Sequence, residues 1–192
     1  MKLSRDFYLR DDVVIIARDL IGKKLITCIG GKQTTGMITE TEAYEGETDR
    51  ASHAFGGRKT QRTEIMYQIG GRAYIYLCYG IHSLFNIVTN QDGIPHAVLI
   101  RGIKPLTGLE TMLERTGKKQ IKKDFGNGPG KVSRALGIHY SQTGIDLLGD
   151  IIWLEENKFD HEKFMIETTI RVGIDYAGED ARLPYRFVLK EK

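Results

Sequence analysis

Two strand-like segments joined by adjacent glycines constrain the fold of this chain more than any other feature. Residues 24–29 form an apolar run, Gly30-Gly31 follows, and a second strand-like run spans residues 34–43. Two glycines between such runs are typical of a two-residue hairpin turn, because glycine adopts the positive φ angles of that turn without strain. The chain is therefore expected to contain an antiparallel sheet.

Further strand-like runs are separated by turn residues along the chain. Strands are expected at residues 73–78, 82–89, 97–103, 144–154 and 164–172, and helices at residues 11–22, 64–68, 107–115 and 131–136. The lysine-rich residues 118–123 are expected to form a loop, and no regular element is expected in the tail from Gly173. Short strands joined by turns, with a few helices, indicate the α+β class: one mixed domain over residues 1–192 around an antiparallel sheet with flanking helices.

The composition fits a folded protein without membrane segments. Hydrophobic residues make up 41% of the 192 residues, which is ample for a core, and the net charge of +3 is compatible with nucleic-acid binding without being diagnostic of it. The N-terminus carries no apolar targeting segment, and no run of about 18 apolar residues follows. These features predict a cytoplasmic protein that does not enter a membrane.

The two cysteines, Cys28 and Cys78, lie inside apolar strand-like runs. They are expected to be buried thiols of a protein from a reducing compartment. Neither a CxxC nor an HxxxH spacing occurs, which argues against a structural zinc site.

Two carboxylates, Glu40 and Glu42, alternate along one expected strand. Side chains two residues apart in a strand face the same side and lie about 7 Å apart. Paired glutamates most often form a solvated strand face. The alternatives are a general base or a site for a hard cation. Arg101 ends a later apolar strand, where it either emerges at the sheet edge or pairs with an anion such as Glu42.

A long polar segment between residues 44 and 71 carries a histidine, His53, and then a glycine- and cation-rich loop. Loops of this length in compact domains are usually functional or disordered. Gly56-Gly57 allows the backbone to approach a ligand closely, and Arg58, Lys59 and Arg62 suit phosphate groups. No serine nucleophile elbow or nucleotide phosphate loop is present, which argues against a nucleophilic triad and a nucleotide cofactor.

Tyrosines cluster in the next expected hairpin. Tyr74 and Tyr76 share one face of a strand, as in an aromatic ladder that packs within a sheet. Tyr79 falls at the hairpin tip beside Gly80, where burial gains little and a wedge or stacking platform for bases is favoured. Asn86 lies in an apolar run, so its amide needs hydrogen-bond partners or reads the edge of a base.

Together these residues resemble the 3-methyladenine (alkyladenine) DNA glycosylase family of base-excision repair. The resemblance covers nearly the whole chain, in order. It is carried by Thr41-Glu42-Ala43-Tyr44, Ala51-Ser52-His53, Gly57-Arg58, Tyr76 to Gly80, Asn86-Ile87, Leu99-Ile100-Arg101, Gly128-Pro129-Gly130-Lys131, Arg171 to Ile174 and Ala177 to Arg182.

The resemblance implies a fold, a reaction and a partner. It implies a single mixed domain with a curved antiparallel sheet and no helix-hairpin-helix. It implies a monofunctional hydrolase that releases alkylated or deaminated purines, such as 3-methyladenine, 7-methylguanine and hypoxanthine, from double-stranded DNA and leaves an abasic site. It also implies a monomer that needs no metal and no organic cofactor.

The resemblance also implies roles for individual residues. By position, Glu42 is the general base that activates water, Arg101 helps to hold that water, and Tyr79 fills the gap left by the flipped nucleotide. Lys131 joins the cations of the glycine-rich loop as a contact to the DNA backbone.

The base pocket is assigned in the same way. Tyr44 and Tyr76 sandwich the extruded base, and His53 lies at its edge. Asn86 excludes the exocyclic amine of normal guanine. Two departures from the family pattern stand out: His82 follows the wedge where a larger aromatic residue is frequent, and Thr60-Gln61-Arg62-Thr63 lacks the usual proline and asparagine.

Two other functions fit part of the same pattern. One is a non-catalytic protein that binds lesions without releasing the base. The other is a metal-dependent hydrolase that uses Glu40, Glu42 and His53 as ligands, and its activity would be lost with a chelator. The joint presence of Glu42 and Arg101 favours the glycosylase over the binding protein.

Overall fold

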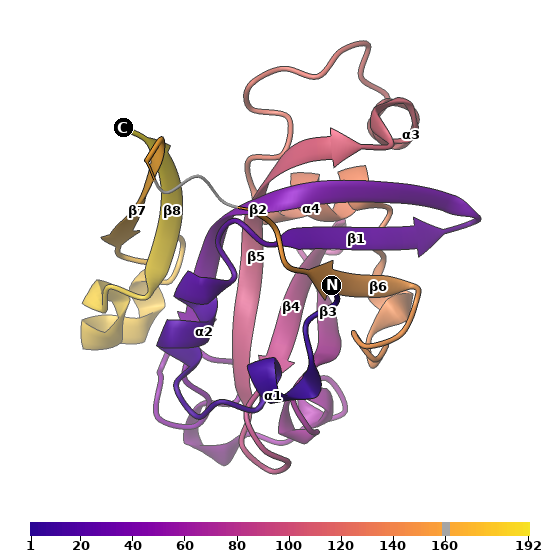
Figure 1. Ribbon diagram of the computed structural model, residues 1–192. Helices are drawn as coiled ribbons and strands as arrows, with labels where there is room; N and C mark the ends of the chain where they lie inside the picture. The colour runs from indigo at the N-terminus through magenta and orange to yellow at the C-terminus, as the bar shows by residue number, and fades with distance from the viewer. Residues whose placement is uncertain (159–161) are drawn as a thin grey trace.

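One eight-stranded antiparallel sheet organises the protein in the computed structural model, which describes residues 1–158 and 162–192 (Figure 1). The strands are β1 (Lys24–Ile29), β2 (Lys32–Tyr44), β3 (Arg72–Cys78), β4 (His82–Thr89), β5 (His96–Thr107), β6 (Ile152–Glu155), β7 (Phe164–Thr169) and β8 (Arg186–Glu191). Their order is β3-β4-β5-β2-β1-β6, with β8 pairing β2 and β7 pairing β8. The expected α+β fold with a curved antiparallel sheet is confirmed.

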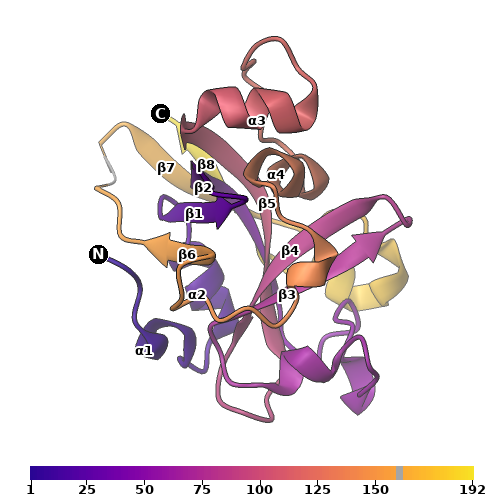
Figure 2. The same cartoon turned by 90° about the vertical axis from the view of Figure 1, so that its right-hand side faces the viewer.

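Strand β2 is the branch point of the sheet. One of its edges pairs with β5, while its other edge pairs with β1 through residues 32–37 and with β8 through residues 40–42. The β2–β5 register shifts around Glu40, as in a β-bulge, and bulges bend a strand and increase its twist. This bend contributes to the strong curvature of the sheet (Figure 2).

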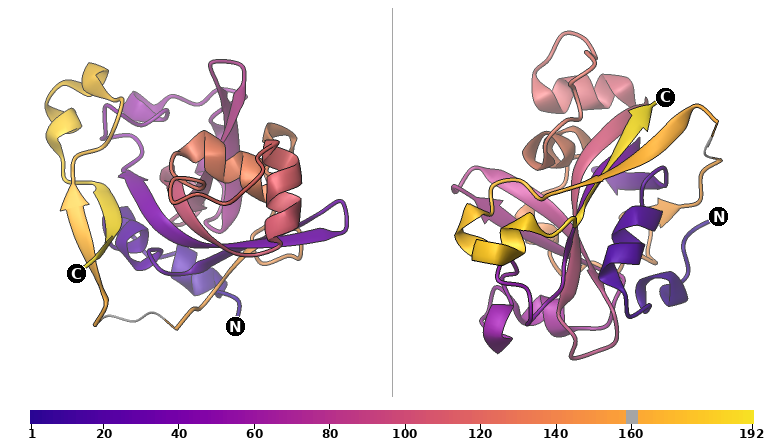
Figure 3. Two further views of the ribbon diagram at one scale, coloured as in Figure 1. Left: turned by 90° about the horizontal axis from the view of Figure 1, so that it is seen from above. Right: turned by 90° about the vertical axis from the view of Figure 1, so that its left-hand side faces the viewer.

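Four α-helices flank the sheet: α1 (Arg5–Tyr8), α2 (Val13–Asp19), α3 (Leu109–Thr116) and α4 (Pro129–Leu136). Asp12 caps α2, because its Oδ1 accepts hydrogen bonds from the backbone N–H groups of Val14 at 2.8 Å and Ile15 at 2.9 Å. Helix α2 packs on β2 and β5, α4 packs on β4 and β5, and α3 lies beside α4 (Figure 3).

Most expected elements occur near their expected places, with three corrections in the C-terminal third. The strand expected at residues 144–154 is reduced to β6, because residues 144–147 bond to Ala73 and Gly71 at the outer edge of β3 with a single isolated bridge, and turns and bends at residues 147–151 separate them from β6. The tail, for which no element was expected, forms β8, which is stabilised by pairing with both β2 and β7. The strand expected at residues 164–172 ends earlier, at Thr169.

The core consists of buried apolar side chains from the whole length of the chain. Residues such as Tyr8, Phe85 and Leu154 form a large cluster between the sheet and the helices. Cys28 and Cys78 carry free thiols, but both are half-buried rather than buried, since each lies at or near the end of its strand. None of the described helices is long and apolar enough to cross a membrane.

Candidate functional site

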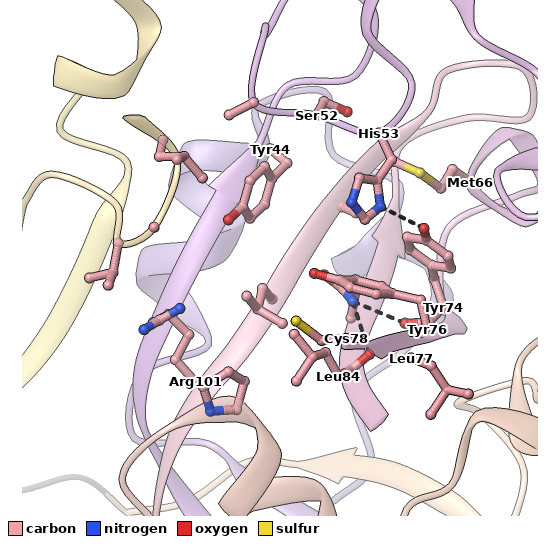
Figure 4. Close-up of a pocket in the computed structure, with 18 of the residues that line it drawn as sticks. Tyr44, Ser52, His53, Met66, Tyr74, Tyr76, Leu77, Cys78, Leu84 and Arg101 are labelled. Carbon is pink, nitrogen blue, oxygen red and sulfur yellow. Dashed lines mark hydrogen bonds between the residues drawn. The ribbon is translucent and has the colours of Figure 1, made fainter. Parts of the chain in front are cut away.

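A cavity of about 480 Å³ opens beside the β3–β4 hairpin, and aromatic side chains form much of its wall. This volume is within the usual range of about 300–1,000 Å³ for small-molecule sites. Tyr44 and Arg101 lie on one side of the cavity, and His53, Tyr74 and Tyr76 lie on the other (Figure 4). The curled sheet therefore brings strands β2, β3 and β5 to one site.

Glu42 lies directly behind this wall, with a fully buried side chain. Its Oε1 accepts a hydrogen bond from the backbone N–H of Val172 at 2.8 Å, and its Oε2 accepts one from the Tyr44 hydroxyl at 2.9 Å. Both donors belong to residues that line the cavity. The contact with Val172 has no signature in sequence, because a backbone N–H belongs to every residue type except proline.

Burial shifts the pKa of Glu42, and neighbouring groups offset part of that shift. Burial raises the pKa of the Glu42 carboxyl, while the charge of Arg101 and the hydrogen bonds from Val172 and Tyr44 oppose that rise without cancelling it. A carboxylate with a raised pKa accepts a proton more readily than an exposed one. The site thus holds one carboxylate that is suited to act as a base.

Arg101 joins the two strand carboxylates. Its Nε lies 2.9 Å from Glu40 Oε1 and 3.4 Å from Glu42 Oε1, so both glutamates project to the same side of β2 as expected. Arg186, on β8, also donates to Glu40 Oε1, at 2.7 Å. Glu42 is therefore a partner of Arg101, but Glu40 is the closer one.

A buried ion pair supports the wall next to Glu42. Both side chains of the pair Arg171–Asp49 are almost fully buried, and Arg171 donates to both carboxylate oxygens of Asp49. Arg171 also donates to the backbone oxygens of Ala43, at 2.9 Å, and Asp180, at 3.1 Å. Its guanidinium carbon lies 4.9 Å from the ring centroid of Tyr44. The pair thus holds the tyrosine that hydrogen-bonds Glu42.

His53 is held by neighbours on the opposite wall. Its Nδ1 lies 2.7 Å from the Tyr74 hydroxyl, and its ring meets Tyr76 edge-on with centroids 4.6 Å apart. Burial, together with the charges of Arg62 and Arg58, lowers the pKa of His53 to about 4, so the imidazole is neutral at neutral pH.

The ligand set considered for a metal is not brought together. His53 bonds to Tyr74, whereas Glu40 and Glu42 bond to Arg101. Among the described residues, no group of three or more His, Cys, Asp or Glu side chains is placed to hold a metal ion. The geometry therefore gives the metal-dependent interpretation no support.

Asn86 presents a fixed amide to the cavity. It is 4% exposed, and its Nδ2 donates to the backbone oxygens of Tyr74 at 3.1 Å and Leu84 at 3.2 Å. The expectation that this amide needs partners is confirmed. Because both amide hydrogens are used, the carboxamide cannot rotate without losing these bonds.

Tyr79 stands at the tip of the β3–β4 hairpin, which projects from the body of the protein (Figures 2 and 3). Its side chain is 92% exposed and its neighbour Ile81 is 74% exposed. The backbone of Tyr79 has a φ of 51°, which is uncommon for a residue with a Cβ atom. The side chain gains little from packing, and the backbone adopts a φ that is unfavourable for tyrosine. Together these two features indicate a role other than packing.

The end of this hairpin next to its tip contacts the start of α4 through His82. A Cβ atom at Gly130 would lie 3.1 Å from the ring of His82, so glycine at this position permits the close approach of helix and hairpin. The histidine that departs from the family pattern is thus in contact with the Gly128-Pro129-Gly130-Lys131 motif.

The four cations expected at a DNA backbone are not equivalent. Arg58 and Lys59 are exposed on the loop after His53, with Lys59 over the Tyr67 ring at 5.2 Å, and Lys131 pairs with Asp124 at 3.1 Å. Arg62 instead lines the cavity. Its guanidinium carbon lies 4.7 Å from the Tyr76 ring centroid.

The chain matches the family model described as "Methylpurine-DNA glycosylase (MPG)" over residues 6–192. It is 45% identical over 197 residues to a Clostridium acetobutylicum protein, covering 99% of this chain and 95% of that protein. It is 46% identical over 191 residues to a Chlamydia felis protein, covering 99% and 97% respectively. Both relatives carry the description "Putative 3-methyladenine DNA glycosylase".

Proposed function

The chain belongs to the methylpurine-DNA glycosylase family, and from this we propose that it removes alkylated or deaminated purines from double-stranded DNA. The proposed substrates are 3-methyladenine, 7-methylguanine and hypoxanthine, and the product is an abasic site in an uncut strand. The observation that carries the proposal is the placement of Glu42: a buried carboxylate with a raised pKa, bonded directly to the wall of an aromatic cavity.

The first step is extrusion of the damaged nucleotide. A base inside a duplex hides its bond to the sugar, so the enzyme flips it out and offsets the lost stacking. Tyr79, exposed at the hairpin tip, enters the minor groove to fill the gap. The flipped purine stacks between Tyr44 and Tyr76, with His53 at its edge.

The second step is hydrolysis. Glu42 accepts a proton from water as the water oxygen attacks the sugar carbon, and the ionised carboxylate offsets the positive charge that develops on the sugar. Arg101, which lines the cavity and bonds to Glu42, holds the attacking water. Asn86 rejects normal guanine, since its fixed carboxamide leaves no room for the exocyclic amine.

The proposal extends to the whole chain. Residues 1–192 act as one catalytic domain, because strands from both ends of the sequence pair in a single sheet. The enzyme works as a monomer in the cytoplasm without metal or organic cofactor. Arg58, Lys59, Arg62 and Lys131 are the proposed contacts to the DNA backbone, where positive side chains bind phosphates.

Base release in the presence of EDTA tests the proposed function. The substrates are a duplex with one hypoxanthine and the same duplex with one N7-methylguanine, and undamaged duplex is the control. We expect strand breaks only after alkali treatment, because an abasic site is alkali-labile whereas the enzyme itself does not cut. Tight lesion binding without release would favour the non-catalytic binding protein, and release that EDTA abolishes would favour the metal-dependent hydrolase.

Tyr79→Ala is expected to weaken binding to lesion-containing duplex by about 1–3 kcal/mol, the scale of one lost stacking contact. The side chain is exposed, so its loss removes little packing from the free protein. Equilibrium binding on a catalytically inactive background measures the effect, and Tyr79→Phe, which keeps the aromatic face, is the matched control. Equal affinity of wild type and Tyr79→Ala would remove Tyr79 from the wedge role.

A further inference from the structure

Arg62 occupies an unusual place for a residue expected to bind phosphate. Its guanidinium carbon lies 4.7 Å from the centroid of the Tyr76 ring, and its Nη2 lies 3.4 Å from His53 Nε2. The residue is exposed on its outer side and borders the cavity. A positive charge is therefore held against the aromatic wall on which the flipped base stacks in the proposed function.

The charge of Arg62 is not neutralised on that wall. Its neighbours there are His53, Tyr74 and Tyr76, which are neutral at neutral pH, and the pKa of His53 is lowered by burial and then by the charges of Arg62 and Arg58. No acidic side chain of the described residues forms an ion pair with Arg62, whereas Arg101 and Arg171 are both paired with carboxylates. Of the two arginines that line the cavity among the described residues, Arg101 is paired with carboxylates and Arg62 is not.

We propose that Arg62 sets the charge preference of the pocket, favouring the release of neutral purines such as hypoxanthine over cationic ones such as N7-methylguanine. The inference rests on the proposed function. It assigns to Arg62 a specificity-determining role beyond the contact to the DNA backbone proposed above.

The chemistry of the two leaving groups gives the direction. As the water oxygen bonds to the sugar carbon and a water proton passes to Glu42, the electron pair of the glycosidic bond moves onto the purine. Hypoxanthine thereby gains negative charge, which a nearby guanidinium stabilises, and the departing base then takes a proton from solvent. N7-methylguanine starts with a positive charge, so the same guanidinium opposes its entry into the pocket.

The magnitude follows from the distance and the exposure of Arg62. A purine stacked on Tyr76 lies about one further ring spacing from the guanidinium, and two unit charges at about 8 Å in a partly hydrated site alter an equilibrium by roughly fivefold. The kcat/KM ratio of N7-methylguanine to hypoxanthine is therefore expected to rise about fivefold in Arg62→Gln.

Three variants separate this role from phosphate binding. Arg62→Lys keeps the charge and is expected to keep most of the wild-type ratio. Lys59→Gln removes a cation of the same loop that lies over Tyr67, outside the cavity wall, and is expected to lower release of both bases by the same factor. If Arg62→Gln also lowers both rates equally and leaves their ratio unchanged, Arg62 is a backbone contact and the inference is overturned.

A binding measurement keeps the inference testable if wild type releases no base, which would refute the proposed function instead. On the Glu42→Gln background, Arg62→Gln should tighten binding of duplex with N7-methylguanine about fivefold relative to duplex with hypoxanthine. An unchanged ratio of the two dissociation constants would overturn the charge preference, whatever the outcome of the release assay.

Discussion

Glu42→Gln is expected to lower the rate of base release by about 10²- to 10⁴-fold, the usual contribution of a general base. Glutamine has nearly the same shape, but it accepts no proton from water and offsets no positive charge on the sugar. Single-turnover release of hypoxanthine measures the loss. Affinity for lesion-containing duplex is expected to be retained, because the aromatic walls and the hairpin tip are untouched. Release at the wild-type rate would exclude Glu42 as the base.

The folding stability of the same variant is the control. A group with a raised folded pKa adds stability below its unfolded pKa, and that stability is lost as the pH rises through the folded pKa. Burial raises the pKa of Glu42, so ionisation at neutral pH costs the wild type some stability that Glu42→Gln does not lose. We expect the variant's Tm at pH 7 to be no lower than that of wild type. A much lower Tm would mean that lost release reflects unfolding.

The pH dependence of release follows from the same pKa. In its proposed role Glu42 accepts a proton only when ionised, so the rate is expected to fall on the acidic side as the pH drops through the raised pKa of its carboxyl. Residual release by Glu42→Gln should lack this acidic limb, which separates the titration of Glu42 from effects on DNA binding.

Asp49→Ala is expected to lower the free energy of unfolding by about 3–5 kcal/mol, because it leaves the buried Arg171 guanidinium without its counter-charge. For a protein of this size, that loss corresponds to a decrease in Tm of roughly 6–20 °C. Chemical denaturation and thermal scans measure both quantities. The effect should extend to base release, because Arg171 contacts the ring of Tyr44 and Tyr44 bonds to Glu42.

A double variant tests the mechanism of that loss. Arg171→Met combined with Asp49→Ala removes both charges, so part of the stability is expected to return. The remainder is lost with the hydrogen bonds that the two side chains make to backbone groups. Asp124→Ala breaks the exposed pair with Lys131 and is the matched surface control, with no measurable change of Tm expected. If the double variant were as unstable as Asp49→Ala alone, the unpaired buried charge would not be the cause.

Local sequence patterns predicted the elements whose partners are near in sequence. The glycine pair at residues 30–31 marked the β1–β2 hairpin, and Asp12 marked the start of α2. Strand β8 was missed because one of its partners, β2, lies more than 140 residues earlier, and the other, β7, is separated from it by the 3-10 helical residues 175–182. The strand expected at residues 144–154 was too long: its apolar pattern is real, but turns and bends at residues 147–151 separate the part that follows the edge of β3 from β6.

The residues of the candidate site also fall into those that local sequence patterns identified and those that they did not. Unusual residues within one short pattern, such as Asn86 and Arg101, were identified from sequence, and the structure brings both to the cavity. Asp49 and Arg171 are 122 positions apart, so nothing local indicated that they pair. Arg62 was grouped with the other cations of its loop, because sequence does not reveal that its side chain turns toward Tyr76.

The backbone conformation at the hairpin tip affects which residue evolution would favour at the position of Tyr79. Tyr79 and Gly80 both have positive φ, at 51° and 72°, and Ile81 N–H bonds to Cys78 C=O, which is the geometry of a type I′ turn. Such turns favour Asn at the position that Tyr79 occupies. Selection for thermostability alone would therefore replace the tyrosine, whereas under the proposed wedge role selection under DNA damage would keep it.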